Sequence, residues 1–445
     1  MSMRINSILS IIIALVCAQS AFAQPKDNSP YSRMGLGDLS SLAYTANLGS
    51  GGFTAAYNDP YQTNALNPAS LGYLMATSYE FGFNAEFASS SQNDLTSTAW
   101  SGNLKTISLA FPVFNPISNL QERKERKFKW AMQFGLSPFS TVGYDIESLE
   151  SDPDLGTVRN TFRGEGGLYQ LNIGNGFKYN NIALGFSVNR LIGNIENSRI
   201  IDAPSLLNSY VVNYIDDYSM RSWSLTGGMQ YTLNFKKTDD KGDEVNRGDK
   251  IVFGAYGNLG SNLDFKASQL YYTRNQFYPQ LAIDTLLYTE NAELTSNLPA
   301  SYTVGIAYHK NNKLRIGIDY SQSFWSEFEN PLRDEQLVDA NKLNAGVEFI
   351  PNSKSYNSYA KRIHYRAGFF YENDYRVVNT NLRNVGISIG AGFPIRLPRQ
   401  QVSAVNLSLE LGQFGSPDLI MEKYAKINIG FTLNDNLWFF KRKFY

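Results

Sequence analysis

Apolar and polar residues alternate with a period of two along most of the chain after residue 76. The pattern is clearest in "YEFGFNAEF" (79–87), "FKWAMQFGL" (128–136) and "VGISIGAGF" (385–393). Successive side chains of a β-strand point to opposite faces, so this period predicts strands with one apolar and one polar face. Gly, Ser, Thr and Asn dominate the polar face, whereas large aliphatic and aromatic residues occupy the apolar face.

Fourteen such segments can be counted. They begin near residues 76, 103, 127, 168, 182, 218, 251, 299, 314, 342, 362, 384, 403 and 424. If the N-terminus lies on the inner side of a membrane, every second connection should be a short turn on that side. The two shortest connections, 180–181 and 310–313, both fall there. The long connections 139–167, 194–217, 266–298 and 326–341 all fall on the opposite side, although three connections on the inner side, 114–126, 234–250 and 351–361, are also longer than usual.

The composition of the two faces favours a membrane barrel over a soluble β-sandwich. A solvated sandwich face carries Lys and Glu, whereas the polar face here carries mostly small uncharged residues. No apolar run after residue 24 approaches the about 18 residues of a membrane-spanning helix. We therefore expect an all-β fold in which residues 76–434 form a transmembrane antiparallel β-barrel of about 14 strands. A soluble sandwich is the alternative.

The first residues have the pattern of an export signal. Arg4 precedes the apolar stretch Ile8–Ala18, and Ala21-Phe22-Ala23 matches a cleavage site. Residues 1–23 are therefore predicted to be a signal peptide, with Gln24 as the first mature residue. Lipidation of Cys17 is the alternative, although the residue before it is not small. Cleavage would remove the only cysteine, so the mature chain would form no disulfide and no thiolate metal site.

Residues 24–75 differ in character from the strands that follow. The stretch "GGFTAAYNDPYQTNALNPASLGYL" (51–74) is rich in Gly, Asn and Pro, which favours irregular, turn-rich structure. A fourteen-stranded barrel encloses a wider lumen than the eight-stranded barrels that side chains alone can fill. We expect residues 24–75 to fold inside this lumen as a hatch, or plug. A flexible tail is the alternative, but the segment carries more apolar residues than disordered tails usually do.

Composition argues against several functional classes. The chain has 40 basic and 40 acidic residues, so its net charge gives no reason to expect a polyanionic partner such as nucleic acid. The only two histidines, His309 and His364, lack a serine or metal partner at motif spacing. Phosphate-binding and zinc-binding motifs are absent. We expect no catalytic residue, no cofactor and no metal ligand, and therefore a protein that is not an enzyme.

Several stretches resemble, in their order along the chain, the FadL-type outer-membrane transporters of long-chain fatty acids and other hydrophobic compounds. They are "ALNPASLGYL" (65–74), "LPASYTVGIAY" (298–308), "LRIGIDYSQSFWSEF" (314–328), "LNAGVEFIP" (343–351), "HYRAGFFYEN" (364–373), "GISIGAGFPI" (386–395) and "VNLSLELG" (405–412). Each motif is weak by itself, whereas the ordered series spans essentially the whole mature chain. The N-terminal "SPYSRMGLGDL" (29–39) departs from the transporter pattern and resembles a diverged branch of the family.

The resemblance implies a 14-stranded barrel with an N-terminal hatch in the outer membrane of a Gram-negative bacterium. Asn67, Pro68 and Ala69 match the family's hatch motif, which suggests a gating or positioning element. Ligand-pocket residues of the family cannot be aligned individually with this chain.

The family also has a kinked third strand that opens a lateral gap toward the lipid. The corresponding strand here ends near Pro138, which cannot donate a hydrogen bond to a neighbouring strand. Leu136 and Phe139 would flank such a gap. The alternative is that Pro138 simply ends the strand.

Two inward-facing arginines are candidate ligand contacts. Arg315 or Arg366 could bind a substrate carboxylate in a bidentate manner. The alternative is that they pair with acidic residues of the wall and plug. Residues 435–445, which end in "LWFFKRKFY", are predicted to be an aromatic and basic tail.

Two functions fit these patterns. The first is passive transport of long-chain fatty acids or other hydrophobic compounds across the outer membrane. The second is a non-transporting, diverged barrel that acts as a subunit or shuttle of an outer-membrane secretion or assembly complex. The expected partners are the lipid bilayer, hydrophobic small molecules, and outer-membrane or periplasmic proteins.

Overall fold

A computed structural model describes residues 29–92, 95–114, 127–206, 209–238, 244–276, 282–311, 313–378, 380–396 and 402–435. The predicted signal peptide and residues 436–445 of the predicted tail lie outside these ranges. The long strands are β2 (Thr77–Gln92), β3 (Leu95–Pro112), β4 (Phe128–Asp152), β5 (Gly156–Tyr179), β6 (Ile182–Asp202), β7 (Tyr210–Thr238), β8 (Glu244–Asn258), β9 (Ser261–Asn275), β10 (Ala282–Leu298), β11 (Ser301–Lys310), β12 (Leu314–Ser323), β13 (Ala340–Phe349), β14 (His364–Val378), β15 (Thr380–Arg396), β16 (Val402–Gly415) and β17 (Met421–Asp435).

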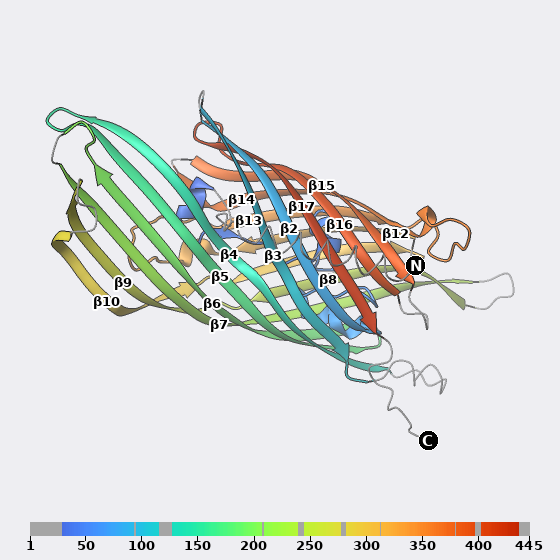
Figure 1. Ribbon diagram of the computed structural model, residues 1–445. Coiled ribbons are helices and arrows are strands. Elements are labelled where there is room, and N and C mark those ends of the chain that lie inside the picture. Colours follow the sequence, from blue (N-terminus) through green and yellow to red (C-terminus); the bar gives the residue numbers. More distant parts are fainter. Residues whose placement is uncertain are drawn as a thin grey trace, which may run out of the picture.

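These strands form one closed antiparallel barrel (Figure 1). β8 and β9 lie in line, since both pair with successive parts of β7. In the same way, β11 and β10 pair with β8 and β9 and are interrupted only at residues 299–300. Counted as continuous strands, they complete a fourteen-stranded wall that closes between β17 and β2. The prediction of a 14-stranded antiparallel barrel is confirmed.

Short turns lie at one end of the barrel and long extensions at the other. The turns after β5 and β11 lie at the end where β2 begins. At the opposite end, β4 to β7, β9 and β10 project together, and we call this part the outer arm (Figure 1). The expectation of long irregular connections at 139–167, 194–217 and 266–298 was therefore wrong, because most of these residues continue the strands. Of the four long connections expected at this end, only 326–341 is largely irregular, and the short helix η3 (Trp325–Glu327) lies at its start.

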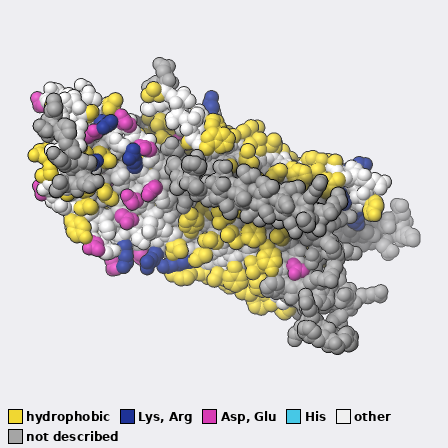
Figure 2. Space-filling view, viewed as in Figure 1, with side chains coloured by type: hydrophobic (Ala, Val, Ile, Leu, Met, Phe, Trp, Pro, Cys, Tyr) yellow, Lys and Arg dark blue, Asp and Glu magenta, His cyan; other side chains and the backbone are white. Residues whose placement is uncertain are grey.

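The apolar face of the strands changes sides at the base of the outer arm. On β7, Trp223 and Leu225 point outward and are 60% and 51% exposed. Farther up the same strand, Tyr218 and Met220 are buried inside, whereas Asp217 is exposed. An apolar exterior suits lipid, and a polar exterior with an apolar interior suits water. Figure 2 shows the resulting apolar band on the barrel and charged side chains over the arm.

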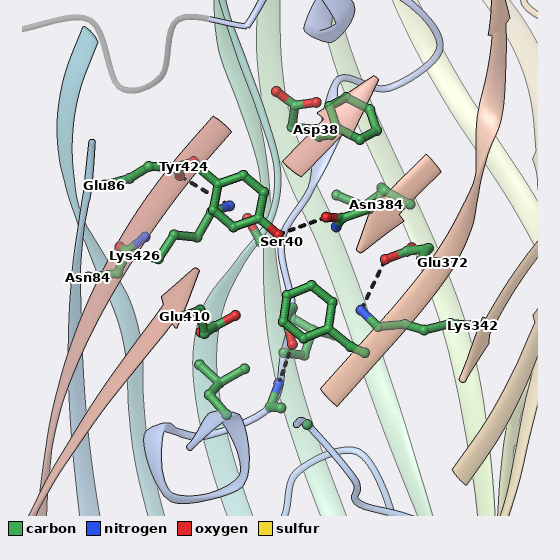
Figure 3. A pocket seen from close by; sticks show the side chains of 18 of the residues that line it. Asp38, Ser40, Asn84, Glu86, Lys342, Glu372, Asn384, Glu410, Tyr424 and Lys426 are labelled. Carbon is green, nitrogen blue, oxygen red and sulfur yellow. Dashed lines mark hydrogen bonds and ion pairs between the residues drawn. The ribbon is translucent and has the colours of Figure 1, made fainter. Parts of the chain in front are cut away.

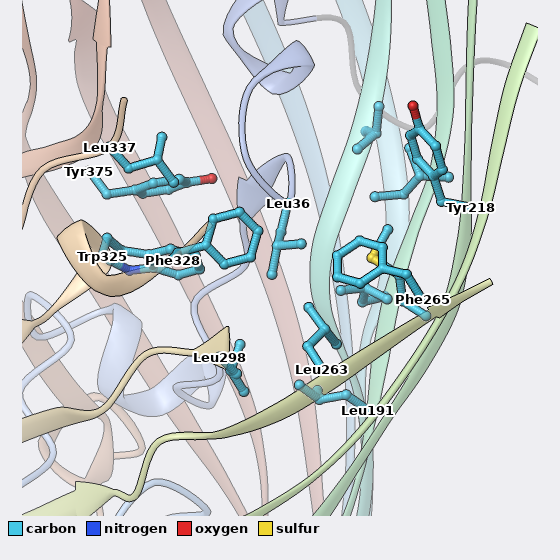
Figure 4. Close-up of a cluster of buried hydrophobic side chains, with 14 of the residues drawn as sticks. Leu36, Leu191, Tyr218, Leu263, Phe265, Leu298, Trp325, Phe328, Leu337 and Tyr375 are labelled. Carbon is cyan, nitrogen blue, oxygen red and sulfur yellow. The ribbon is translucent and has the colours of Figure 1, made fainter. Parts of the chain in front are cut away.

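Residues 29–76, which we call the N-terminal segment, lie in the lumen. They contain the short elements η1 (Pro30–Arg33), β1 (Asp38–Leu39), α2 (Thr45–Leu48) and η2 (Pro68–Tyr73). Toward the outer arm, Leu36 packs in a hydrophobic cluster that includes Trp325, Tyr375 and Phe265 (Figure 4). The rings of Trp325 and Tyr375 are stacked with centroids 4.3 Å apart. None of the helices in the described ranges is long and apolar enough to span a membrane.

Candidate functional site

The N-terminal segment contacts the wall through glycines on the inner face of the barrel. A Cβ added at Gly254 would lie 1.9 Å from the Ala55 carbonyl oxygen, and one at Gly346 would lie 1.9 Å from that of Ser50. Cβ atoms do not approach other atoms so closely, so the backbone of the segment fits only against glycine here. Similar close approaches occur around the barrel, at Gly176, Gly185, Gly228, Gly317, Gly368 and Gly430.

Hydrogen bonds from wall side chains hold the same part of the segment. The carboxylate of Asp319 on β12 accepts the backbone N–H groups of Thr54 and Ala55. On β7, the Gln230 side chain donates to the Ala55 carbonyl oxygen at 2.8 Å. Asp319 and Gln230 are each 1% exposed. Buried polar groups stabilise a fold when they are paired, so these bonds fix the segment to two strands of the wall, β7 and β12.

The residues of the hatch motif lie at the start of η2, where the segment crosses β5, β6 and β7. The Asn67 side chain accepts the Ala69 N–H at 3.1 Å and donates to the Ala55 carbonyl oxygen at 2.7 Å. Asn67 therefore caps η2 and ties it to residues 54–55. A Cβ at Gly185 would lie 2.3 Å from the Pro68 carbonyl carbon. Asn67 and Ala69 are fully buried.

The structure brings Arg315 and Arg366 to one carboxylate, that of Glu348. Arg366 Nε lies 2.6 Å from Glu348 Oε2, and Arg315 Nη1 lies 3.2 Å from Oε1. Arg315 also pairs with Asp59 of the N-terminal segment at 3.4 Å. Arg366 donates to Asn406 at 2.8 Å. A carboxylate of the wall thus already occupies the position that a substrate carboxylate would take between the two guanidinium groups.

β3 and β4 pair with each other over a short stretch only, and above it the two strands have the unpaired edges that a lateral opening would need. The two strands pair only from Ile107–Pro112 to Ala131–Leu136. Beyond Leu136, β4 continues to Asp152 with β5 as its partner, and its register shifts between Pro138 and Ser140. In Figure 1, β3 and β4 diverge above this point. Leu136 thus forms the last β3–β4 pair, and Phe139 lines a cavity of about 140 Å³ beside it.

Just beyond the last β3–β4 pair, the N-terminal segment pairs with β4 where β3 no longer does. Asp38 and Leu39 of β1 pair with Thr141 and Ser140 of β4. The Ser40 N–H donates to the Phe139 carbonyl oxygen at 2.9 Å. The segment therefore satisfies the edge of β4 that β3 leaves.

A charged chamber of about 420 Å³ lies between the N-terminal segment and the inner faces of β2, β3 and β13 to β17 (Figure 3). Its charges are largely paired: Lys426 lies 3.1 Å from Glu86, and Lys342 lies 3.1 Å from Glu372. Lys105 donates to the Ser41 carbonyl oxygen at 2.9 Å. Such a lining suits water or a polar ligand better than a hydrocarbon.

A carboxyl group outside the spanning strands contacts the segment near the arm. Glu335, in the connection before β13, accepts the Gly35 N–H at 2.8 Å. Burial raises the pKa of Glu335 above its usual value of 4.5, while the Gly35 hydrogen bond and Arg333 act in the opposite direction.

Sequence reasoning did not identify Asp319 as an anchor of the segment. Its partners are backbone N–H groups 264 and 265 residues away, and backbone groups leave no mark in a sequence. The glycines can be recognised in the sequence, because they recur on the inner face of successive strands. An open lumen would accept any polar residue at these positions.

Comparisons with known proteins place this geometry in a family. The BamG family model matches residues 4–445. No curated protein matched the sequence. The Pseudomonas putida toluene transporter TodX has a similar fold, with TM-score 0.53 and 16% identity over 89% of this chain and 99% of that one. A Pseudomonas aeruginosa FadL homologue gives TM-score 0.53 and 14% identity over 88% and 98%.

At such identities the likeness to these channels establishes the fold, an outer-membrane-type barrel, and not the activity. The family model covers nearly the whole sequence, including the N-terminal segment and every strand of the wall. The chain belongs to the BamG family.

Proposed function

We propose that this protein is a non-transporting subunit of an outer-membrane assembly complex, anchored in the Gram-negative outer membrane by its barrel after cleavage of a signal peptide. The family name, BamG, connects the family with such a complex. The observation that carries the proposal is the charged lining of the chamber between the N-terminal segment and the wall.

A conduit for hydrophobic compounds needs a continuous apolar path, because apolar molecules gain little from a site lined by charges. The chamber instead contains Glu86, Lys342, Glu372, Glu410 and Lys426. A wider path could open only if the N-terminal segment broke its contacts with the wall glycines and its hydrogen bonds to Asp319 and Gln230. These contacts favour a permanent plug over a moving hatch.

The outer arm supplies a surface for protein partners. Near its tip, Tyr210, Leu286 and Tyr288 are 61%, 54% and 65% exposed, on strands whose outward face below the tip is polar. Exposed apolar groups above the lipid band are typical of protein contacts.

Purification from the native membrane in mild detergent tests the proposal. An affinity-tagged chain is expected to co-purify with other outer-membrane proteins in fixed stoichiometry. Leu286→Ser with Tyr288→Ser should weaken this association, whereas Leu184→Ser, on the lipid face, serves as a control for general effects of removing an exposed leucine. A lone barrel that carries bound lipid would contradict the proposal.

Transport of long-chain fatty acids or other hydrophobic compounds is the second candidate, and the unpaired strand edges beside Leu136 and Phe139 favour it. In this role Asn67, Pro68 and Ala69 would gate the path. Deletion of the gene should then abolish growth on long-chain fatty acids, and Asn67→Ala should alter uptake without loss of the folded barrel. Normal growth of the deletion strain on these compounds would rule out this candidate.

A further inference from the structure

Three long stretches of strand, among the described residues, have a strand partner on one side only. The first is Leu95–Gly102 of β3, which pairs with β2 alone. The second is the part of β4 beyond Thr141, and the third is β10. Unpaired strand edges bind other strands readily, so natural proteins protect them with charges, prolines, bulges or covering segments.

Two of these edges are protected. On β4, β1 pairs at Ser140 and Thr141, and the strand then carries acidic residues at 145, 147, 150 and 152. On β10, the pairing with β9 has three register shifts, and the strand carries Asp284, Glu290 and Glu293. Both edges therefore have the features that prevent addition of a further strand.

Residues 95–102 of the β3 edge have none of these features, whereas Lys105 and the register shift of this strand pair lie below them. These residues read "LTSTAWSG", without a charge or a proline. They pair with β2 in unbroken register from Leu95 with Gln92 to Gly102 with Ala85. The only register shift in this strand pair lies farther down, between Gly82 and Phe83. The stretch is therefore a regular, uncharged edge beside the unpaired stretch of β4.

The two faces of this edge indicate what can bind there. Trp100 points outward, is 64% exposed and packs on Phe87 with ring centroids 4.9 Å apart. Ala99 and Ser101 point inward and line the charged chamber. A strand added beside β3 would continue both faces. Its side chains would alternate between apolar groups next to Trp100 and polar groups next to the chamber, which is the pattern of a strand of a membrane barrel.

We infer that residues 95–102 of β3 bind an amphipathic β-strand of another outer-membrane barrel protein by strand addition. Backbone hydrogen bonds to the free edge supply the affinity, and the alternating side chains supply the selectivity. The facing edge of β4 already pairs with an added strand, β1 of the N-terminal segment. The inference rests on the proposed role in an assembly complex and identifies the class of partner.

Site-specific photo-crosslinking in native membranes tests it. A photoreactive residue replaces Thr98, which is exposed on the free edge, and in a control it replaces Thr295, which is exposed on the protected β10. The Thr98 derivative is expected to give a product with a different outer-membrane barrel protein, with the crosslink mapped by mass spectrometry to a strand of alternating polarity. The Thr295 derivative should give at most a tenth as much of this product.

A second variant checks the mechanism. Thr96→Lys with Thr98→Lys, and the photoreactive residue at Ala99, puts charges on this edge, as the acidic residues do on the other two, and should abolish the crosslink. The folded barrel is monitored by its heat-dependent gel migration. Crosslinking to a second copy of this chain, to lipid alone or to nothing would overturn strand addition. If the complex still co-purifies in that case, the proposed function stands and only this site is wrong.

Discussion

The Asp319 carboxylate on the barrel wall accepts the backbone N–H of Ala55 in the lumen at 2.8 Å, across 264 residues of sequence. The same carboxylate accepts the N–H of Thr54. A single inward side chain thus satisfies two neighbouring donors of a segment without regular structure. This relationship explains how an irregular chain is held inside a barrel, and it leads to the first prediction.

Asp319→Ala should loosen the N-terminal segment without unfolding the barrel. Two buried donors lose an ionised acceptor, and hydrogen bonds to charged groups contribute about 1.5–3 kcal/mol each. We expect faster proteolysis and faster hydrogen exchange within residues 50–60. Asp264→Ala, at an exposed position on β9, is the matched control and should leave both rates unchanged.

Replacement by alanine should destabilise the protein at one of two neighbouring glycines on β7 and have no effect at the other. A Cβ at Gly228 would lie 2.3 Å from Asn67 Oδ1, whereas one at Gly227 would meet nothing within 4 Å. Gly228→Ala should cost about 1–3 kcal/mol through overpacking and displace η2, and Gly227→Ala should be neutral. The temperature at which folded gel migration is lost measures the difference. Equal effects of the two substitutions would show that the segment does not rest on the wall.

Glu348→Gln should destabilise the half of the barrel that lies next to the short turns. It leaves Arg315 and Arg366 without their shared carboxylate, and removal of one partner from a buried ion pair costs about 3–5 kcal/mol. Thermal denaturation in detergent is the measurement. The exposed pair of Lys266 and Glu293, 3.4 Å apart, provides the control, since Glu293→Gln should cost less than about 1 kcal/mol.

The buried position of Glu335 against Gly35 should become less stable as pH rises, because burial disfavours the ionised carboxyl group more than the Gly35 hydrogen bond favours it. Because the pKa of Glu335 is raised in the folded state, the unfolded chain releases this proton first. The contribution of Glu335 to stability is therefore complete below its usual pKa of 4.5 and is lost as pH rises through the folded value. Hydrogen exchange at Gly35, compared with that of Glu335→Gln at each pH, should show the change. A constant ratio of the two rates across pH 4 to 8 would contradict this prediction.

Part of the candidate site could be predicted from the sequence because it depends on local chemistry. Pro138 cannot donate a hydrogen bond to a neighbouring strand, and β3 pairs with β4 only as far as Leu136. The expectation that the strand ends near Pro138 was wrong, because β4 continues to Asp152 with β5 as its partner. The position of Asn67 before Pro68 suits the start of a short helix, where its side chain caps the Ala69 N–H. The roles of Arg315 and Arg366 stayed open, because only their distances to Glu348 distinguish pairing within the wall from binding of a ligand.

The sequence by itself determined the number, order and direction of the strands. A period of two on a membrane-spanning wall is imposed by the backbone and the lipid, and each segment shows it independently. The sequence did not predict that strands would continue through 139–167, 194–217 and 266–298. In this arm the apolar face turns inward to cover Leu36 and its neighbours. The assumption that apolar residues of a strand face lipid therefore no longer applies.

Only the tertiary structure decided what fills the lumen and where an edge stays open. The bonds from Asp319 and Gln230 to residues 54–57 join positions far apart in the chain and involve backbone groups that every residue has. The free edge of β3 exists because β4 leaves it above Leu136 and pairs with β1 instead. Both features are set by the closure of the barrel around the N-terminal segment, a global condition that no local stretch of sequence encodes.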